Sequence, residues 1–414
     1  MSWETDTLSN NAKVISGFAF KSDSFRTDKG VPIIKIKNIQ REYVEIDGEY
    51  FVEDSFLSLD PKYHCVKSDI LISLTGSHIT LPNSVVGRVA KYHYDFTSLL
   101  NQRGGKIVVT NPKKLWNDYL YYFLCQNEIR IKLAQFGRGG ANQCNISPSN
   151  VESITIILPP LQTQKRIASI LSAYDDLIEN NLKRIKLLEE TAQNIYKEWF
   201  VNFRFPNYEN TPISGETGLP EGWEVKTIDN IIEFKVDNRG RNPEYYTEKG
   251  IPVIDNFLLK DSIAVDLSNC KRYIDDQLFE NFIRKHLKPD DVLITLVGNL
   301  GSISLAPQTK SVIIQNTIGL RCNNLGSQYF LFWFLKNSKE KIFNMNRGVA
   351  QPSVIIGDLL NMQIIVPNTN VINDFTLTIK SVFEMVNRLV VQNQKLKEAR
   401  DILLPRLMNR TIEV

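Results

Sequence analysis

The stretch that decides the fold is PPLQTQKRIASILSAYDDLIENN, which occupies residues 159–181. Two prolines end the segment before it, and the run that follows contains no glycine and no further proline. Its apolar residues recur at helical spacing with charged residues between them, which is typical of a long amphipathic helix. This helix begins near the middle of a chain of 414 residues, and a second helix of the same kind ends the chain.

Composition limits the class of protein. The length predicts two to four domains, and the 43% hydrophobic and 23% charged residues are ordinary for a globular chain. No apolar run approaches the roughly 18–20 residues that span a bilayer, and the polar N-terminus lacks a secretory signal. The five scattered cysteines form no CxxC pair, so we expect a cytoplasmic protein with reduced thiols and no metal site. The net charge of +3 neither requires nor excludes a nucleic-acid partner.

The chain repeats itself. The matching pairs are SWETDTL (2–8) with GWEVKTI (222–228), DKGVPIIKI (28–36) with EKGIPVIDN (248–256), SDILISLTGS (68–77) with DDVLITLVGN (290–299), and GGANQCNISPSNVESITIILP (139–159) with RGVAQPSVIIGDLLNMQIIVP (347–367). They keep their order at a spacing of roughly 205–220 residues, which indicates a tandem duplication. Each unit contains short β-rich runs and turn signals and ends in a proline that precedes a long helix. Within the first unit, residues 115–136 predict one helix.

We therefore predict an α+β protein. It has two tandem globular domains of mixed α/β structure, related by a pseudo-twofold internal repeat, and two long helices that form an antiparallel coiled coil. The predicted boundaries are 1–158 for the first domain, 159–203 for a central helical spacer, 204–367 for the second domain with a linker at 204–222, and 368–414 for a C-terminal helical spacer. The linker is assigned because it is rich in Pro, Gly and Asn.

The two long helices each carry a heptad seam. Alternating steps of four and three residues, begun at Ile167 and at Phe375, meet almost only apolar side chains. In antiparallel packing Asn181 faces Asn393 and Tyr174 faces Arg400, and a helix of about 40 residues forms a rod about 60 Å long. The alternative is that each is an ordinary core helix of its own domain. The predicted seam residues are Ile167, Leu171, Ile178, Asn181, Ile185, Leu188, Ile379, Val386, Leu389, Asn393 and Leu396.

Catalytic motifs are missing from the sequence. It contains neither a GxxxxGK[ST] phosphate loop nor a GxGxxG motif after a strand, and no Asn-Pro-Pro-Tyr or Asp-Pro-Pro-Tyr motif of a methyltransferase. The four histidines show no metal-ligand spacing. The sequence therefore predicts a binding or scaffolding protein rather than an enzyme, with no catalytic residue and no metal ligand.

Side chains suited to reading DNA lie in the duplicated, glycine-bordered segments. Arginine reads guanine, asparagine and glutamine read adenine, and lysine and arginine neutralise phosphates. The alternative for each is a solvated surface residue. The candidate DNA-binding residues are Lys35, Lys37, Asn38, Arg41, Arg103, Arg138, Asn142 and Gln143 in the first unit, and Asn238, Arg239, Arg241, Asn256, Lys260, Asn299, Arg347 and Gln351 in the second.

The sequence resembles the specificity subunit of type I restriction-modification systems over essentially the whole chain. The motifs that carry the resemblance are ISGFAFKSDSF (15–25), DILISLTGS (69–77), GGANQCNIS (139–147), LPPLQTQKRIASILSAYDDLIENN (158–181), LPEGWE (219–224) and LKEARDILLPRLMNR (396–410). The second long helix begins within VPNTNVINDFTLTIKSVFEMV (366–386) and lacks the Pro-Pro and Gln-x-Gln-Lys-Arg elements of the first. The two helices are therefore not expected to offer equivalent docking surfaces.

The resemblance implies the function. Each globular domain would be a target recognition domain that reads one half of a bipartite site in double-stranded DNA. The helices would form the spacer and dock two methyltransferase subunits, and a restriction and translocase subunit would join the full complex. S-adenosylmethionine, ATP and Mg²⁺ would bind those partner subunits, and this chain would hold no cofactor. Two alternatives remain open: a coiled-coil adaptor whose domains bind protein, and a specificity chain for a different methyltransferase arrangement.

Overall fold

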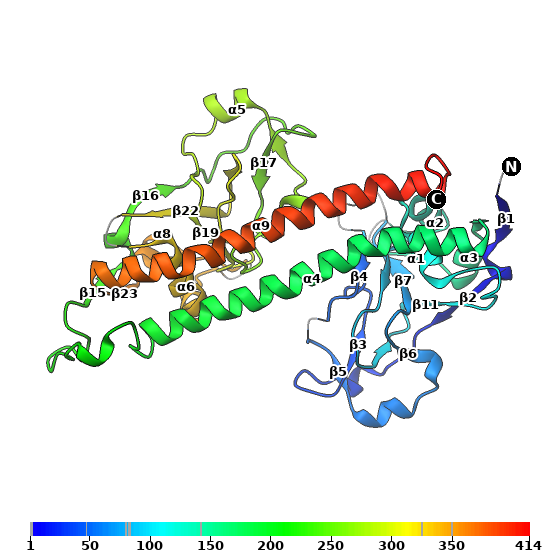
Figure 1. Cartoon of the computed structure of the whole chain (residues 1–414), viewed down its shortest axis with the longest axis horizontal. Coiled ribbons are helices and arrows are strands. Elements are labelled where there is room, and N and C mark those ends of the chain that lie inside the picture. Colours follow the sequence, from blue (N-terminus) through cyan, green and yellow to red (C-terminus); the bar gives the residue numbers. More distant parts are fainter. Residues whose placement is uncertain are drawn as a thin grey trace. The chain divides into compact units, whose positions relative to one another are not determined.

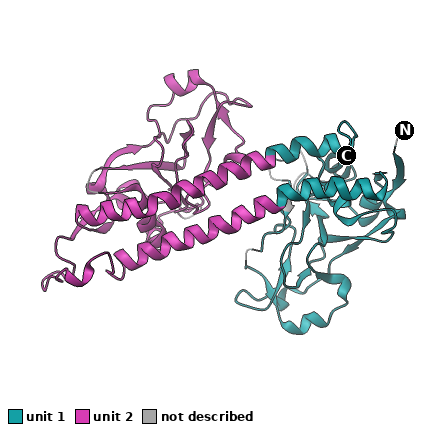
Figure 2. Ribbon diagram, in the orientation of Figure 1, with its two compact units in different colours: residues 1–175, 398–414 teal, residues 176–397 magenta. Residues whose placement is uncertain are grey.

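The computed structural model describes residues 3–46, 48–78, 81, 84–140, 143–323, 326–348 and 351–414. The chain forms two compact units: residues 1–175 with 398–414, and residues 176–397 (Figure 2). In the described part of the chain, no helix is both long enough and apolar enough to cross a membrane.

The first unit is built on a five-stranded sheet in the order β2-β11-β7-β9-β4 (Figure 1). Its strands are β2 Ala12–Ser16, β4 Glu42–Tyr43, β7 Ile70–Ser73, β9 Val89–Lys91 and β11 Gly104–Val109. The central strand β7 is buried along its whole length, as its apolar run predicts. A second sheet, in the order β5-β3-β10-β6, contains β3 Val31–Ile34, β5 Phe51–Val52, β6 His64–Cys65 and β10 Ser98–Leu100. Strand β1 (Glu4–Thr7) pairs with β14 (Thr155–Leu158).

The helix expected at residues 115–136 is two helices, so that prediction is wrong. They are α1 (Asn117–Cys125) and α2 (Asn127–Gln135). The break lies at Gln126, whose backbone is extended (φ −61°, ψ 136°) and whose side-chain amide donates to the Phe123 carbonyl at 3.0 Å. A third, short helix, α3 (Pro148–Glu152), starts at a capping box formed by Ser147 and Asn150.

The second unit repeats this plan, which confirms the predicted internal repeat. Its sheet order β16-β22-β19-β20 reproduces β2-β11-β7-β9, and β18-β17-β21 reproduces β5-β3-β10, including one parallel pair in each. Its strands are β15 Glu224–Thr227, β16 Ile232–Val236, β17 Ile251–Ile254, β18 Tyr273–Ile274, β19 Val292–Thr295, β20 Ile303–Leu305, β21 Val312–Ile313, β22 Thr317–Cys322 and β23 Gln363–Val366. Its helices are α5 Asp276–Asn281, α6 Gln328–Asn337, α7 Lys339–Asn344 and α8 Ile356–Leu360.

Short 3-10 helices occur in both units. They are η1 Leu8–Asn10, η2 Ser22–Ser24, η3 Asp54–Ser58 and η4 Pro61–Tyr63 in the first, and η5 Tyr208–Asn210, η6 Ile228–Ile231, η7 Asn256–Leu258 and η8 Leu267–Asn269 in the second.

The two long helices are α4 (Leu161–Phe200) and α9 (Thr369–Met408), each of 40 residues. Within the second unit the Asn181 Nδ2 donates to Asn393 Oδ1 at 2.9 Å, and the rings of Trp199 and Phe375 lie 5.7 Å apart. Residue numbers rise along one helix as they fall along the other, so the predicted antiparallel pairing and its Asn–Asn contact are confirmed.

The predicted facing of Tyr174 and Arg400 stays a prediction. Within the first unit Arg400 Nη1 forms an ion pair with Asp175, the residue after Tyr174, at 2.5 Å. The carboxylate is the better partner for a guanidinium, because it accepts charge-assisted hydrogen bonds.

The seam residues serve the cores of the units as well as the helix pair. Nine of the eleven are buried, and Leu188 and Leu396 are partly buried. Ile167 and Leu171 belong to the core of the first unit, and Ile379 and Val386 to that of the second. The two interpretations from sequence, seam helix and core helix, therefore both apply. The boundaries at 158, 203 and 367 stay predictions.

The buried Asn181–Asn393 pair gives a first test. Asn181→Leu alone should lower the free energy of unfolding by about 1–3 kcal/mol, because the Asn393 amide then loses its Asn181 partner while it stays buried in an apolar seam. Asn181→Leu combined with Asn393→Leu should restore stability to within about 1 kcal/mol of the parent, since no polar group is then orphaned. Urea unfolding measures both. A double variant as unstable as the two single variants added together would contradict the direct contact.

Candidate nucleic-acid interface

A tight hairpin carries two of the candidate DNA-reading side chains of the first unit. Strand β12 (Arg138–Gly140) pairs with β13 (Gln143–Asn145), and β13 pairs in turn with β8 (Thr75–Gly76). Along the hairpin Cys144 is buried, whereas Arg138 and Gln143 are exposed. The alternation of a strand thus anchors one side chain in the core and presents the polar ones to solvent.

Glycines make this hairpin possible. A Cβ at Gly137 would lie 2.1 Å from Cys144 Sγ, and one at Gly139 would lie 2.2 Å from the Gln143 carbonyl oxygen. Gly139 also has a φ of +125°, which L side chains rarely adopt. The candidate residue Asn142 lies outside the described residues.

The second unit has an equivalent loop. Gly298 N–H donates to the Pro352 carbonyl at 3.0 Å, and Val297 forms a β-bridge with Ser353. A Cβ at Gly298 would lie 3.2 Å from Gln351 Nε2 and 3.3 Å from Asn256 Nδ2. Two of the predicted adenine-reading amides therefore converge over this glycine, although they are far apart in the sequence.

Two of the candidate asparagines are buried and hydrogen-bonded to the backbone. Asn38 is 3% exposed, and its amide joins the Lys35 N–H to the Glu45 carbonyl. Asn238 is 2% exposed, and its amide joins the N–H and carbonyl of Lys285. Both amides satisfy buried backbone groups, so these residues are structural and do not face a ligand.

Two arginines of the second unit are also engaged within the fold. Arg239 Nε and Nη2 donate to the two carboxylate oxygens of Asp237, at 2.9 and 2.8 Å, and the Arg239 hydrogen bond lowers the pKa of Asp237. Arg241 Nη1 donates to the Phe282 carbonyl at 3.0 Å. Their first role is to hold the loop that follows β16.

The remaining cationic candidates lie at the surface or against aromatic rings. Lys35 Nζ lies 3.1 Å from the ring centroid of Tyr50, and Lys37 pairs with Glu49. Arg347 pairs with Asp358 at 2.7 Å and keeps 63% of its side chain exposed. The other cationic candidates, Arg41, Arg103 and Lys260, are exposed, and so is the candidate Asn299.

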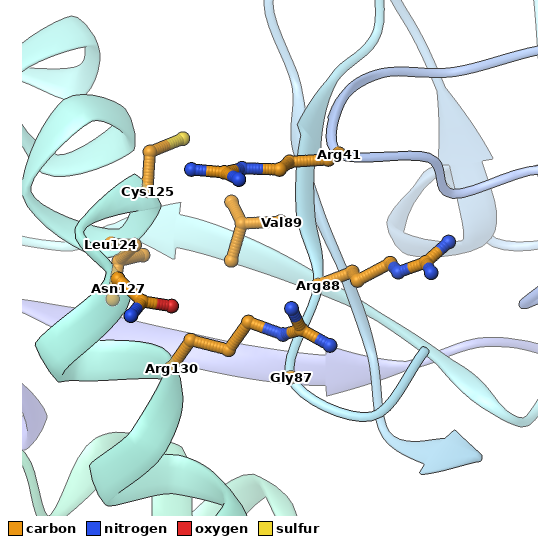
Figure 3. Close-up of a pocket in the computed structure, with 8 residues that line it drawn as sticks. All are labelled: Arg41, Gly87, Arg88, Val89, Leu124, Cys125, Asn127 and Arg130. Atoms are coloured by element: carbon orange, nitrogen blue, oxygen red, sulfur yellow. The ribbon is translucent and has the colours of Figure 1, made fainter. Parts of the chain in front are cut away.

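A cluster of three arginines is the feature that the sequence interpretation missed. Arg41, Arg88 and Arg130 are among the residues that line one small pocket, and Figure 3 shows Arg41 extending toward Cys125 and the Arg88 side chain extending away from Cys125 and Asn127. We call this pocket the arginine pocket. Only Arg41 was a candidate from sequence, because Arg88 on the approach to β9 and Arg130 in α2 stand in no motif. Among the described residues, no group of three His, Cys, Asp or Glu could hold a metal ion.

Comparisons with known proteins show the family and the fold. The family model for the type I restriction modification DNA specificity domain matches twice, at residues 2–190 and 220–374. A putative type I restriction enzyme MjaX specificity subunit of Methanocaldococcus jannaschii is 26% identical over 100% of this chain and 94% of its own length. The EcoBI specificity subunit of Escherichia coli is 21% identical over 94% of this chain and 81% of its own. The crystal structure of the S subunit from M. genitalium superposes with a TM-score of 0.56 at 15% identity, covering 98% of this chain and 96% of that one, which shows the same fold. The chain belongs to the family of type I restriction-modification specificity subunits.

Proposed function

We propose that each unit reads one half of a bipartite DNA site through its hairpin, and that the paired long helices fix the separation of the two halves. The observation that carries the proposal is a hairpin in the first unit and an equivalent loop in the second. The hairpin exposes Arg138 and Gln143 and pairs with β8, and the loop exposes Arg347 and Gln351 and is bridged to Val297.

The chemistry of these side chains fits base recognition. Arginine donates two hydrogen bonds to guanine, and glutamine pairs with the N6 and N7 positions of adenine. The loops differ between the copies, since Asn256 joins Gln351 over Gly298 in the second unit. Different side-chain sets predict different half-sites, which makes the whole site asymmetric.

Partner subunits supply the chemistry in this proposal. Two methyltransferase subunits dock on the helical spacer and carry S-adenosylmethionine, and a restriction and translocase subunit uses ATP and Mg²⁺. Exposed leucines on α4 support a docking role, because Leu177, Leu182 and Leu187 are 51%, 55% and 61% exposed. The methyltransferases flip the target adenines out of the duplex, while this chain chooses where they act.

Methylation mapping after exchange of one domain tests the proposal. Residues 1–158 are replaced by the corresponding segment of another family member, and methylated adenines are mapped in cells that also carry the methyltransferase subunits. We expect a new sequence in one half of the site and an unchanged second half. An unchanged site, or duplex binding that depends on neither sequence nor salt, would favour a protein-binding adaptor instead.

A further inference from the structure

We propose that the arginine pocket binds one phosphate of the DNA backbone and so fixes the first unit on its half-site. This inference rests on the proposed function, since it names the anion that a DNA-reading domain would present. The residue that donates to the phosphate is Arg130, and Arg41 and Arg88 add positive charge around it; Arg88 Nη1 itself donates to Gln40 Oε1 at 3.4 Å.

The pocket is built for an anion. Its lining is Arg41, Gly87, Arg88, Val89, Leu124, Cys125, Asn127 and Arg130, and none of these is acidic. Figure 3 shows the Arg41 guanidinium extending toward Cys125 and the Arg130 side chain extending from α2 toward Gly87. Arg130 Nη2 donates to the Ser84 carbonyl at 2.8 Å, whereas its buried Nε has no hydrogen-bond partner among the described residues. A buried guanidinium donor without an acceptor is costly, and a phosphate oxygen would satisfy it.

The fold holds three positively charged arginines near one another, and their mutual repulsion is unfavourable. Burial lowers the pKa of Arg88, and the neighbouring Arg41 lowers it further. Burial likewise lowers the pKa of Arg130, with added repulsion from Arg88 and Arg41. Arginine stays charged despite such shifts, so the positive potential remains for a ligand to relieve.

The size of the pocket selects the kind of ligand. Its volume of about 20 Å³ admits one oxygen atom but no base or sugar. One oxygen of a phosphodiester can therefore enter while the rest of the nucleotide stays outside. A single charged oxygen can accept the Arg130 Nε–H, which has no partner among the described residues.

The internal repeat provides a comparison within the same chain. When Gly30 is aligned with Gly250, Arg41 aligns with Asp261. Gly87 (φ +69°), beside Arg130, corresponds to Gly301 (φ +72°), beside Lys339. In the second unit Asp261 and Lys339 form an ion pair, so that copy is neutralised by its own carboxylate. The first unit has arginine in the place of that carboxylate, so the two copies differ in charge at this position.

The pocket is linked to the hairpin that presents Gln143. Arg130 holds the Ser84 carbonyl, and Ser84 Oγ donates to the Ser77 carbonyl at 2.6 Å. Ser77 follows β8, which pairs with β13 of the hairpin. A phosphate in the pocket would thus be bound beside the loop that reads bases, and phosphate contacts of this kind set the register of a protein on DNA.

The test compares DNA binding by Arg88→Gln and Arg130→Gln in the full chain with its methyltransferase subunits. Each variant should bind every duplex, specific or not, roughly tenfold more weakly, and the slope of log K against log salt should shrink by about 1. Lys132→Gln is the matched control, because it removes one exposed charge from the same helix, α2, outside the pocket. It should change affinity less than about twofold.

A chemical probe identifies the source of the phosphate. Methylphosphonate linkages, which lack the charge, are placed one at a time along the specific duplex. At one linkage the methylphosphonate should weaken DNA binding by the parent protein roughly tenfold. It should leave DNA binding by Arg130→Gln almost unchanged, because that variant has already lost the contact with this phosphate. If inorganic phosphate raises the melting temperature through Arg130 but no linkage shows this coupling, the pocket binds a free anion and the proposal is wrong.

Stability separates a binding role from a structural one. Without DNA or phosphate, Arg88→Gln should raise the melting temperature, because it relieves repulsion, while it lowers DNA affinity. A lower melting temperature with unchanged affinity would show that the cluster only supports the fold. Unchanged affinity of both variants, in a complex whose parent binds its site, overturns the phosphate site and leaves the proposed function intact. Failure of the parent to bind DNA at all would overturn the proposed function itself.

Discussion

Asp175→Ala is expected to lower the free energy of unfolding by about 3 kcal/mol, because it removes the carboxylate from a buried ion pair and leaves the arginine buried. The Arg400 side chain is only 6% exposed and forms its ion pair with Asp175 at 2.5 Å. The Tyr122 hydroxyl also donates to this carboxylate at 2.5 Å. Burial, with the nearby carboxylate, raises the pKa of Tyr122, so the hydroxyl stays a donor. Removing the carboxylate takes an acceptor from Tyr122 and an ion-pair partner from Arg400, which also forms an ion pair with Asp401.

The adjacent carboxylate is the control for this change. Asp176 is exposed on the same helix, so Asp176→Ala should change stability by no more than about 0.5 kcal/mol. Denaturant unfolding measures both variants, and hydrogen exchange should show faster opening of residues 398–408 in Asp175→Ala alone. Equal unfolding midpoints for the two variants would show that the buried ion pair does not hold the end of α9 in the first unit.

The features that the sequence predicts well are those with a local or periodic signal. The long helices follow from apolar spacing kept over many turns, and the repeat follows from aligned motifs in constant order. The heptad register is accurate enough to place Asn181 against Asn393, but it does not reveal the ion pair between Arg400 and Asp175. The break at Gln126 carries no Gly or Pro signal, so periodicity alone could not separate α1 from α2.

The site depends on contacts between distant segments, which a single sequence does not reveal. Asn238 is an exposed polar residue in a loop by composition, and only its contact with Lys285 makes it structural. Arg88 and Arg130 line one pocket although they come from the approach to β9 and from α2, an arrangement that no motif encodes. Exposed hairpin residues such as Gln143 were easier to find, since the flanking glycines mark a loop and loops carry binding residues.

Gly139→Ala is expected to abolish recognition of one half-site while the protein stays folded. Its φ of +125° is strained for alanine, and the new Cβ would lie 2.2 Å from the Gln143 carbonyl oxygen. The pairing of Gly139 with Cys144 must then open, which displaces Arg138 and Gln143 from their common loop. Loss of two base-reading side chains should weaken binding of the specific duplex roughly 100-fold and leave non-specific binding nearly unchanged.

Gly140→Ala is the matched control, one residue along the same hairpin. A Cβ there meets no described atom within 4 Å, and its φ lies outside the left-handed region, so affinity should stay within about twofold of the parent. Gly348→Ala should disturb the loop of the second unit in the same way, because its Cβ would lie 1.8 Å from the Gln351 carbonyl oxygen. Binding to duplexes in which one half-site is scrambled shows which half-site each variant no longer reads. If each hairpin reads its own half, Gly139→Ala no longer distinguishes the first half from a scrambled one, and Gly348→Ala no longer distinguishes the second. If both variants lose the same half, or Gly140→Ala is as defective as Gly139→Ala, the hairpins are not the reading elements.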